Sequence, residues 1–407
     1  FIVHSSPVEN QEADASASAS RPGRKRGRKG RDESSQAPRG GRKWRAGGVF
    51  IAGGMLVLSF YLVILGWVIR YIFLGFSPLP ATAEEAGAVF DDLISHSLVT
   101  SLGFYALALV LTLSVVARGI KSGIERLNVV MMPLLFVLMI VMIVKNLTLD
   151  GVAQGVKFYL TPDFSKINIK LFVEVLGQVF FALSLGFGVM ITLSSFVKKD
   201  EGLVKISIIT GILNTVIAVL AGFMIFPSLF SYGVSPDSGP SLVFKSLPIV
   251  FSHMPFGGFF AVAFFALLMI AALTTSLPIY EVIITTLQEK FKIKRKKAIF
   301  LVLGGIFILG NLPSLMATNI LSHVNVFGKN IFDAYDAISA TIFFVFTSFG
   351  CAIFVGWVLK DDAKKEILQG SEKHAKLINV WFWYIKFVVP FIILVLFISS
   401  FYDNFLK

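Results

Sequence analysis

The stretch Gly177-Gln-Val-Phe-Phe-Ala-Leu-Ser-Leu-Gly-Phe-Gly188 decides the fold of this chain. It lies inside the apolar segment 171–197, which is long enough to cross a bilayer because a spanning helix needs about 20 apolar residues. The middle of the segment holds Ser184, Gly186 and Gly188, which weaken a helix. A broken helix is tolerated in a membrane only where protein or water surrounds it, and its two ends can hold a cation and an anionic group. The stretch therefore predicts a transport site, with close packing of small residues against a neighbouring helix as the alternative.

The composition of the whole chain is that of a polytopic membrane protein. Of the 407 residues, 55% are hydrophobic and 15% are charged, whereas soluble domains carry about 25% charged residues. Lys and Arg gather in loops that alternate with the apolar segments, so the positive-inside rule predicts a cytoplasmic N-terminus and an external C-terminus in a cell's inner membrane. The predicted transmembrane helices are 48–73, 99–117, 127–147, 171–197, 204–226, 257–288, 298–314, 337–360 and 379–402.

The first 45 residues differ from the rest of the chain. Residues 11–20 are rich in Ala and Ser, and residues 21–45 are basic with Gly and Pro, which is a composition typical of disorder. The net charge of +12 raises the alternative of a nucleic-acid-binding tail, but a basic cytoplasmic flank of a membrane helix accounts for it. We expect residues 1–45 to be a disordered segment, residues 46–407 to form the membrane bundle, and nucleic acid not to be a partner.

The sequence gives little support to an enzyme. Its five His residues are scattered without metal-ligand spacing, and the chain shows no nucleophile–base arrangement, P-loop or dinucleotide fingerprint. Cys351 is the only cysteine, so an internal disulfide is impossible. We expect a protein without catalytic residues.

Ordered motifs follow one another along residues 46–402. These blocks are Ser59–Trp67, Ala117–Arg126 with Met132-Pro133, Leu160–Phe164, Gly177–Gly188, Lys198–Glu201, Phe226-Pro227, Gly239–Phe244 with Leu247-Pro248, and Ala271–Ser276. Together they resemble the neurotransmitter:sodium symporter family, which includes the bacterial leucine transporter. The resemblance implies an all-α membrane protein with a LeuT-type inverted-repeat helix bundle, unwound at a central site. It also implies sodium-coupled symport of an amino acid or related amine.

The chain departs from the family at its start. The family's first two helices, with their unwound Gly/Asn segment, have no counterpart, and the nine predicted spans correspond to the third to eleventh family helices. Residues before about 27 do not resemble the family. Half of the bipartite central site is therefore absent, and we expect a truncated or frame-shifted transporter that does not transport alone. The alternative is a non-transporting membrane scaffold or partner-binding protein on the same fold.

A first set of residues is expected to form the substrate site. A Tyr hydroxyl in the membrane core needs a partner, and the resemblance assigns that of Tyr61 to the substrate carboxylate, with a neighbouring helix carbonyl as the alternative. Aromatic residues at such spacing otherwise indicate plain packing. The substrate-binding residues that the resemblance implies are Val57, Tyr61, Phe181, Ser184, Gly186, Phe187, Thr275 and Ile279.

Two sodium sites are expected by the same resemblance, because oxygen ligands suit a hard cation. The first would use the amide of Asn214 and the backbone of Ala182, where the family's hydroxyl residue is missing. The second would use the Ala271 carbonyl with the hydroxyls of Thr274 and Thr275, although Thr hydroxyls commonly bond to carbonyls one turn earlier. Chloride is not expected, because Ala218 offers neither charge nor hydroxyl four residues after Asn214.

Two acidic residues resemble gates. Asp336 is expected at the outer gate and Glu289 at the inner gate, and the partners of both would lie in the absent helices. A solvated interface charge is the alternative for each. Glu281 lies deeper in its span, where a carboxyl group must be protonated or paired. The sequence does not identify the partner of Glu281. It also does not identify the transported amino acid, the sodium stoichiometry or the oligomeric state.

Overall fold

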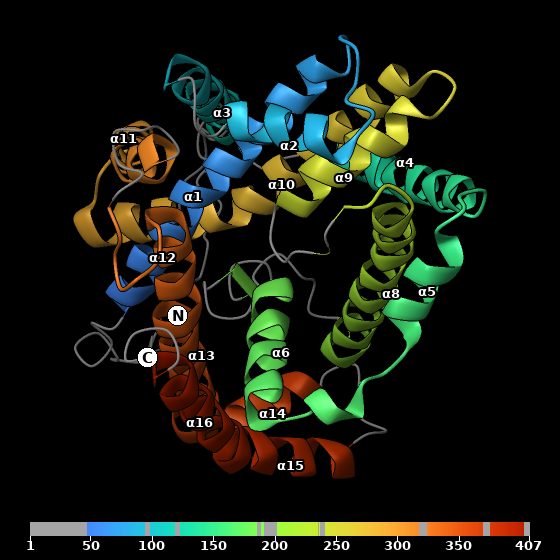
Figure 1. The fold of residues 1–407 in the computed structure, drawn as a ribbon. Coiled ribbons are helices and arrows are strands. Elements are labelled where there is room, and N and C mark those ends of the chain that lie inside the picture. The colour runs from blue at the N-terminus through green and yellow to red at the C-terminus, as the bar shows by residue number, and fades with distance from the viewer. Residues whose placement is uncertain are drawn as a thin grey trace, which may run out of the picture.

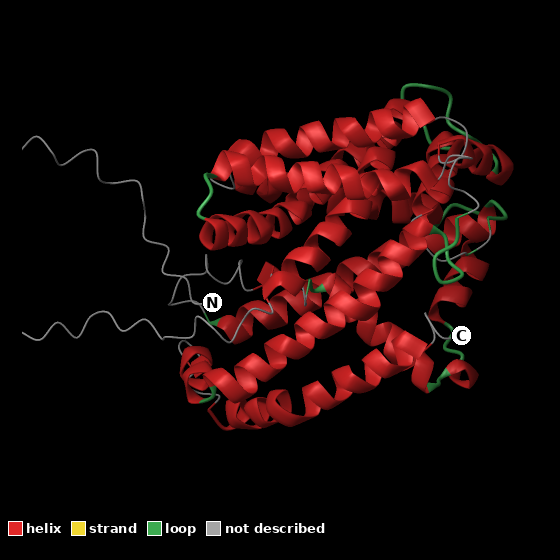
Figure 2. Ribbon diagram, turned by 90° about the vertical axis from the view of Figure 1, so that its left-hand side faces the viewer, coloured by secondary structure: helices red, strands yellow, loops and turns green. Residues whose placement is uncertain are grey.

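The computed structural model describes residues 47–93, 98–118, 123–184, 189–190, 202–234, 236, 241–316, 324–368 and 375–402. Across these ranges the chain is almost entirely helical (Figures 1 and 2). An isolated bridge between Val326 and Lys329 is the one β-type pairing that the described part of the chain contains. The basic segment 1–45 lies outside the described residues.

The helices follow the apolar segments of the sequence. Prolines inside α4, α8, α9 and α10 are tolerated, as is usual where neighbouring helices surround a membrane helix. The α-helices are α1 (Gly47–Leu74), α2 (Ala83–Asp91), α3 (Leu98–Arg118), α4 (Gly123–Asn146), α5 (Val152–Leu160), α6 (Ile169–Ala182), α8 (Leu203–Ser231), α9 (Ser241–Ser252), α10 (Gly257–Phe291), α11 (Arg295–Met316), α12 (Ile331–Ile338), α13 (Val345–Ile353), α14 (Asp361–Leu368), α15 (Ala375–Trp383) and α16 (Val389–Phe401). A 3₁₀ turn, η2 (Phe164–Lys166), precedes α6, and π-helical segments η3 (Ser339–Phe344), η4 (Phe354–Leu359) and η6 (Tyr384–Val388) interrupt the last two spans.

The membrane spans agree with the hydropathy of the sequence. Six stretches of the described chain are long and apolar enough to cross a membrane: Ile51–Leu74, Val129–Asn146, Leu203–Ser231, Gly257–Phe291, Ile331–Leu359 and Leu377–Phe401. The predicted spans 99–117 and 298–314 are helical as α3 and α11, and the predicted span 171–197 begins with α6.

The first span, α1, lies at the centre of the packing. It packs against α10, α11 and α3, which lie around it in Figure 1. Gly54 allows the closest approach to α10, because a Cβ atom at this position would lie 3.2 Å from Ile283. A helix that is apolar on every side is expected to be buried, and most of α1 is buried.

Two apolar cores hold the bundle. The first joins α1, α3, α10 and α11 and includes Val57, Tyr105 and Tyr280. The second joins α1, α2, α4, α9 and α10 around a group of packed rings, among them Trp67 and Phe244, whose centroids are 5.9 Å apart. Most of α8 and much of α6, by contrast, are exposed. The site predicted from the sequence lies between these well-packed and poorly covered parts.

Candidate functional site

The predicted break in the sixth family helix is found in the structure. The helix α6 ends at Ala182, and Ser184 adopts the left-handed conformation with φ of 53°. This conformation is uncommon for a residue other than glycine and is concentrated at functional sites. Val189 is helical again and belongs to the core around α1 and α10. The chain therefore leaves its helix at the expected place, while Gly186 and Phe187 lie outside the described residues.

Three oxygen atoms of α10 come together where the second sodium site is predicted. The Thr274 hydroxyl donates to the Ala271 carbonyl at 2.9 Å and to the Ile270 carbonyl at 3.0 Å. The Thr275 hydroxyl donates to the same Ala271 carbonyl, also at 2.9 Å. Hydrogen bonds of this kind are the alternative considered for both residues in the sequence. They also place both hydroxyls of the predicted ion site within 2.9 Å of the Ala271 carbonyl.

A proline four residues further along changes the backbone at the same point. Pro278 lies inside α10 and has no N–H group, so it cannot donate a hydrogen bond to the Thr274 carbonyl four residues earlier. A backbone oxygen of α10 is thus released from the helix ladder beside the two hydroxyls. The local sequence Thr-Thr-Ser-Leu-Pro therefore concentrates oxygen atoms on one turn of an otherwise apolar helix.

Tyr61 connects the first span to this turn. Its hydroxyl donates a long hydrogen bond of 3.4 Å to the Ala272 carbonyl, and the Thr275 side chain also interacts with it. A bond to a neighbouring helix carbonyl is the alternative considered for Tyr61, and it places the hydroxyl directly beside the exposed Thr275. The structure thus brings together one predicted substrate contact and one predicted ion ligand.

Apolar side chains flank the group of oxygens. Val57 and Ile279 are buried in the same core, on α1 and α10. Phe181, near the end of α6, packs its ring against that of Phe344 in η3, with 5.8 Å between centroids. Val57 and Ile279 thus share one core with Phe344, and Phe181 contacts this core through the Phe344 ring.

The structure does not join Asn214 to this group. Asn214 lies on an exposed part of α8, and the described residues give its amide no hydrogen-bond partner. The helix α8 packs against α4, α5 and α9. Ala182, the other predicted contact of the first sodium ion, is also exposed at the end of α6. The predicted ligands of the first sodium site are accessible and remain separate.

The two predicted gate residues are exposed. Asp336 in α12 and Glu289 near the end of α10 have no ion-pair partner among the residues that the structure describes. Glu281, in contrast, has a partner that the sequence did not reveal. Arg295 donates two hydrogen bonds to its carboxylate, at 2.7 and 2.8 Å, and this bond to Glu281 raises the pKa of Arg295 further above its ordinary value.

A further residue at the site escaped the sequence analysis. Tyr280 is completely buried, and its hydroxyl has no hydrogen-bond partner within the described part of the chain. Tyr61 and Tyr105 lie close enough to interact with it electrostatically. The signal in the sequence was a hydroxyl group within the apolar segment 257–288, directly after Ile279.

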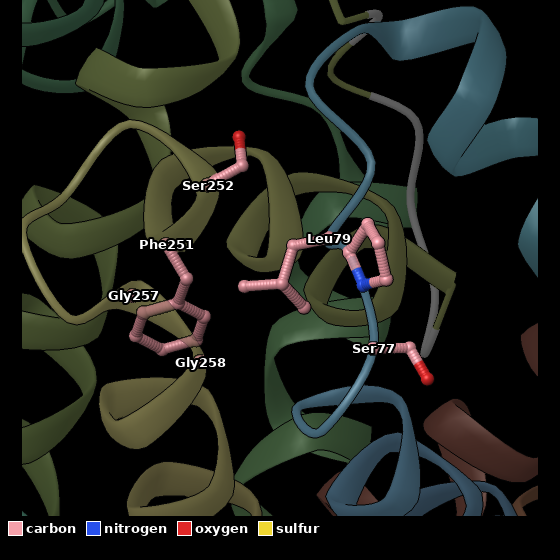
Figure 3. A pocket seen from close by; sticks show the side chains of 7 residues that line it. Ser77, Leu79, Phe251, Ser252, Gly257 and Gly258 are labelled. Carbon is pink, nitrogen blue, oxygen red and sulfur yellow. The ribbon is translucent and has the colours of Figure 1, made fainter.

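A cavity of about 270 Å³ lies elsewhere, where the loop after α1 meets the connection between α9 and α10. Figure 3 shows Leu79 and Phe251 pointing toward one another across it, with Ser77 and Ser252 at its edges. Gly257 in its lining is seventeen residues before Thr274 on α10, which corresponds to roughly 25 Å of helix. This cavity is therefore distinct from the group of oxygens at Thr274 and Thr275.

The broken helix, the apolar spans and the oxygen group define a polytopic membrane transporter. The family described as "SNF: Sodium:neurotransmitter symporter family" matches residues 94–405, and the chain belongs to this family. Its function is sodium-coupled symport, and the resemblance seen in the sequence is confirmed.

Similarities to a solved structure and to curated relatives agree with this family assignment. The structure is similar to the crystal structure of MhsT in complex with L-phenylalanine, with a TM-score of 0.82 and 37% identity over 89% of this chain and 82% of that chain. An uncharacterized sodium-dependent transporter of Haemophilus influenzae is 54% identical over 86% of this chain and 77% of its own length. An uncharacterized sodium-dependent transporter of Bacillus subtilis is 35% identical over 87% of this chain and 78% of its own length.

Proposed function

We propose that this chain, completed by further helices, takes up an amino acid or related amine together with sodium across a cell's inner membrane. The observation that carries the proposal is the convergence of the Ala271, Thr274 and Thr275 oxygens at 2.9 Å on one turn of α10. Hydroxyl and carbonyl oxygens are the ligands that a hard cation prefers. In this proposal sodium replaces the hydrogen bonds between these groups and is held by all three oxygens.

The substrate would lie next to this ion. Tyr61 presents a hydroxyl beside Thr275, and a hydroxyl at this depth can donate to a carboxylate. Val57, Ile279 and Phe181 supply apolar surface nearby, which suits the side chain of an amino acid. The solved relative MhsT holds L-phenylalanine, and this supports an amino-acid substrate here. Ser184, Gly186, Phe187 and Thr275 complete the proposed substrate contacts.

The first sodium site of the sequence analysis is proposed at Asn214 and the Ala182 carbonyl, where it would hold a further sodium ion. Both groups are exposed on helices α8 and α6, which have few neighbours. An amide that lies within a membrane span is costly unless it is used. Ala218 provides no hydroxyl or charge one turn after Asn214, so we expect binding to remain unchanged when gluconate replaces chloride.

The exposed faces of α6 and α8 indicate where further parts of the proposed site would lie. In Figure 1 α6 stands apart from α8, and Phe172, Val175 and Val179 of α6 are exposed. We propose that two further apolar helices, which are not among the described residues, cover these faces and supply the remaining ligands. The proposed inner gate, Glu289, and outer gate, Asp336, would find their charged partners on the same helices.

The test is sodium-dependent binding of radiolabelled amino acids to the purified chain, with and without a co-expressed segment that supplies two such helices. We expect binding only with the added segment, and its loss in Asn214→Ala and Thr275→Ala. Thr286→Ala is the matched control, because Thr286 lies on the same helix and also donates to a carbonyl one turn earlier. Binding by the chain alone would contradict the proposal that additional helices complete the site, and equal loss in Thr286→Ala would contradict the assigned ion ligands.

The proposed orientation places the N-terminus in the cytoplasm and the C-terminus outside. The basic connections at Lys290–Lys297 and Lys360–Lys376 support it, because cytoplasmic loops carry the excess of Lys and Arg. A reporter enzyme that is active only outside the cytoplasm, fused after Lys407, should be active. Activity of the same reporter inserted in the Lys290–Lys297 connection would contradict this orientation.

A further inference from the structure

A lysine lies inside the last membrane span, and the part of the chain that the structure describes gives it no carboxylate partner. Lys386 belongs to η6 and to the span Leu377–Phe401. Two other lysines of this end of the protein, Lys364 and Lys365, form ion pairs with Asp361 and Asp362, both at 3.6 Å. Lys386 forms no ion pair within the residues that the structure describes. Ionisable groups within spans are rare and mark functional positions.

Aromatic rings hold the Lys386 ammonium group in place. Its Nζ atom lies 4.8 Å from the ring centroid of Trp357 and 5.2 Å from that of Phe387. The Trp357 ring also packs edge to face against Phe387, and Trp383 lies beside Phe387. We call Trp357, Trp383, Lys386 and Phe387 the aromatic–lysine cluster. Cation–π contacts attract the charge but leave its hydrogen-bond donors free.

The backbone fixes the position of this cluster. The π-helical segments η4 and η6 pack directly against one another, and a Cβ atom at Gly356 would lie only 2.9 Å from the Lys386 Cα atom. The indole N–H of Trp357 donates to the Lys386 carbonyl at 3.2 Å. Short π-helical segments within helices are frequent at functional sites. The lysine is therefore held in a defined orientation between two spans.

Trp357 places one side of the cluster near the end of the span Ile331–Leu359. Trp357 is two residues before Leu359, where its span ends, so it lies roughly 3 Å along the helix from that end. The chain then turns at Lys360, with φ of 51°, into α14, whose first turn contains Asp361 and Asp362. Trp residues prefer this membrane–water interface. Lys386, which touches Trp357, is therefore within reach of phosphate groups.

The outer side of the cluster faces the surroundings of the protein. Trp357 is 48% exposed, Trp383 59% and Phe387 46%. Exposed aromatic side chains around a cation that lacks a carboxylate match an amphipathic anion, with acyl chains against the rings and a phosphate at the ammonium group. We propose that the aromatic–lysine cluster binds one anionic phospholipid through its phosphate, in the cytoplasmic leaflet if the proposed orientation holds.

The test compares lipid binding by the intact chain and its variants. The purified protein is placed in phosphatidylcholine nanodiscs with or without phosphatidylglycerol, and retained lipid is counted by native mass spectrometry. One lysine near an anionic surface corresponds to roughly a fivefold change in affinity. We expect Lys386→Met to lose about this factor for phosphatidylglycerol and none for phosphatidylcholine, whereas Lys386→Arg keeps the binding. Lys365→Met, on exposed α14, is the matched control and should bind as the unmodified chain does.

Several results would overturn the proposal. Equal retention of phosphatidylglycerol in Lys386→Met, or an equal loss in Lys365→Met, would show that the cluster is not a site. Displacement of the lipid from the unmodified protein by glycerol phosphate would show that the site takes free phosphates instead. A dimer that depends on Lys386 and excludes lipid would show that a second copy covers the cluster. The glycerol phosphate experiment needs no variant, so it stands even if Lys386→Met does not fold. Because no amino acid or sodium is involved, failure here leaves the proposed transport function untouched.

Discussion

The hydroxyls of Thr274 and Thr275 share one acceptor, the Ala271 carbonyl. Replacing Thr274 by Val removes an oxygen ligand but preserves the shape of the side chain and the helix backbone. We predict that Thr274→Val weakens sodium binding roughly tenfold or more, which corresponds to about 1.4 kcal/mol, while Thr274→Ser keeps it. The measurement is the sodium concentration that half-maximally raises the melting temperature, taken in the presence of the two added helices. Equal sodium affinity in the Val and Ser variants would show that the Thr274 hydroxyl is not a ligand.

The ion pair between Glu281 and Arg295 joins α10 to α11. Its bidentate geometry is favourable, but the Arg295 side chain is 37% exposed, so solvent screens part of the interaction. We predict that Arg295→Met and Glu281→Gln each lower the free energy of unfolding by about 1–2 kcal/mol, and that the double variant loses less than the sum. Chemical denaturation of the four proteins would measure this coupling. Strict additivity would mean that the pair does not stabilise the fold.

The pH dependence of this pair follows from the raised pKa of Arg295, caused first by its hydrogen bond to Glu281. A cation whose pKa is raised on folding stabilises the protein fully below its unfolded pKa and loses this effect only above it. Arginine already titrates far above neutrality. We therefore predict that the difference in melting temperature between the unmodified chain and Arg295→Met stays constant from pH 7 to about pH 9. A difference that shrinks within this range would contradict a charged Arg295.

The positions of some residues of the candidate site could be predicted from the sequence, and those of others could not. The Thr pair, Tyr61 and the break at Ser184 could be predicted because they form short motifs on single segments. Arg295 could not, because it meets Glu281 only after α10 ends at Phe291 and the chain reverses at Lys292, which has φ of 51°. Tyr280 was missed because the sequence does not show whether a hydroxyl group in an apolar span has a hydrogen-bond partner.

Among the elements, α5 and α8 pack closely enough to make a single methyl group costly. A Cβ atom at Gly155 would lie 2.5 Å from the Pro227 Cα atom and 2.7 Å from the Phe226 carbonyl oxygen, and backbone atoms cannot move aside cheaply. We predict that Gly155→Ala lowers stability by about 1–3 kcal/mol, as overpacking does. Gly103→Ala in α3, where no atom lies within 4 Å, should be neutral or stabilising by up to about 1 kcal/mol. Thermal melts in one detergent compare the two, and equal effects would contradict the packing of α5 against α8.

The hydropathy of the sequence predicted the positions of the spans but not their internal geometry. The break after α6 was predictable, since Ser and Gly interrupt an apolar segment there. The π-helical segments η3, η4 and η6 were not, because their sequences are ordinary apolar runs and the extra residue in each turn is set by packing against neighbouring helices. The twelve-residue α9 lies outside all the predicted spans, because hydropathy detects only segments long enough to cross a bilayer.

At the scale of the whole molecule, coverage by neighbours is uneven. Most of α1 is buried, whereas most of α8 is exposed although it packs against α4, α5 and α9. A helix of such uniform hydrophobicity is expected to face lipid on one side at most when it belongs to a bundle. The exposed Asn214 and Ala182 lie on these uncovered helices. If the proposed first sodium site is correct, the helices that cover α6 and α8 would also complete this site.

This coupling can be tested by cysteine labelling, because Cys351 is the only native cysteine. In a Cys351→Ala background, Leu213→Cys on α8 and Val179→Cys on α6 replace side chains that are 55% and 42% exposed. We predict that a membrane-impermeant maleimide labels both in the chain alone and that two co-expressed family helices protect both. Phe256→Cys, at an 84% exposed position between α9 and α10, should be labelled in either case and reports that the reagent reaches the protein. Unchanged labelling of Leu213→Cys and Val179→Cys when the helices are present would mean that these faces of α6 and α8 remain accessible to water, and the first sodium site would then need other ligands.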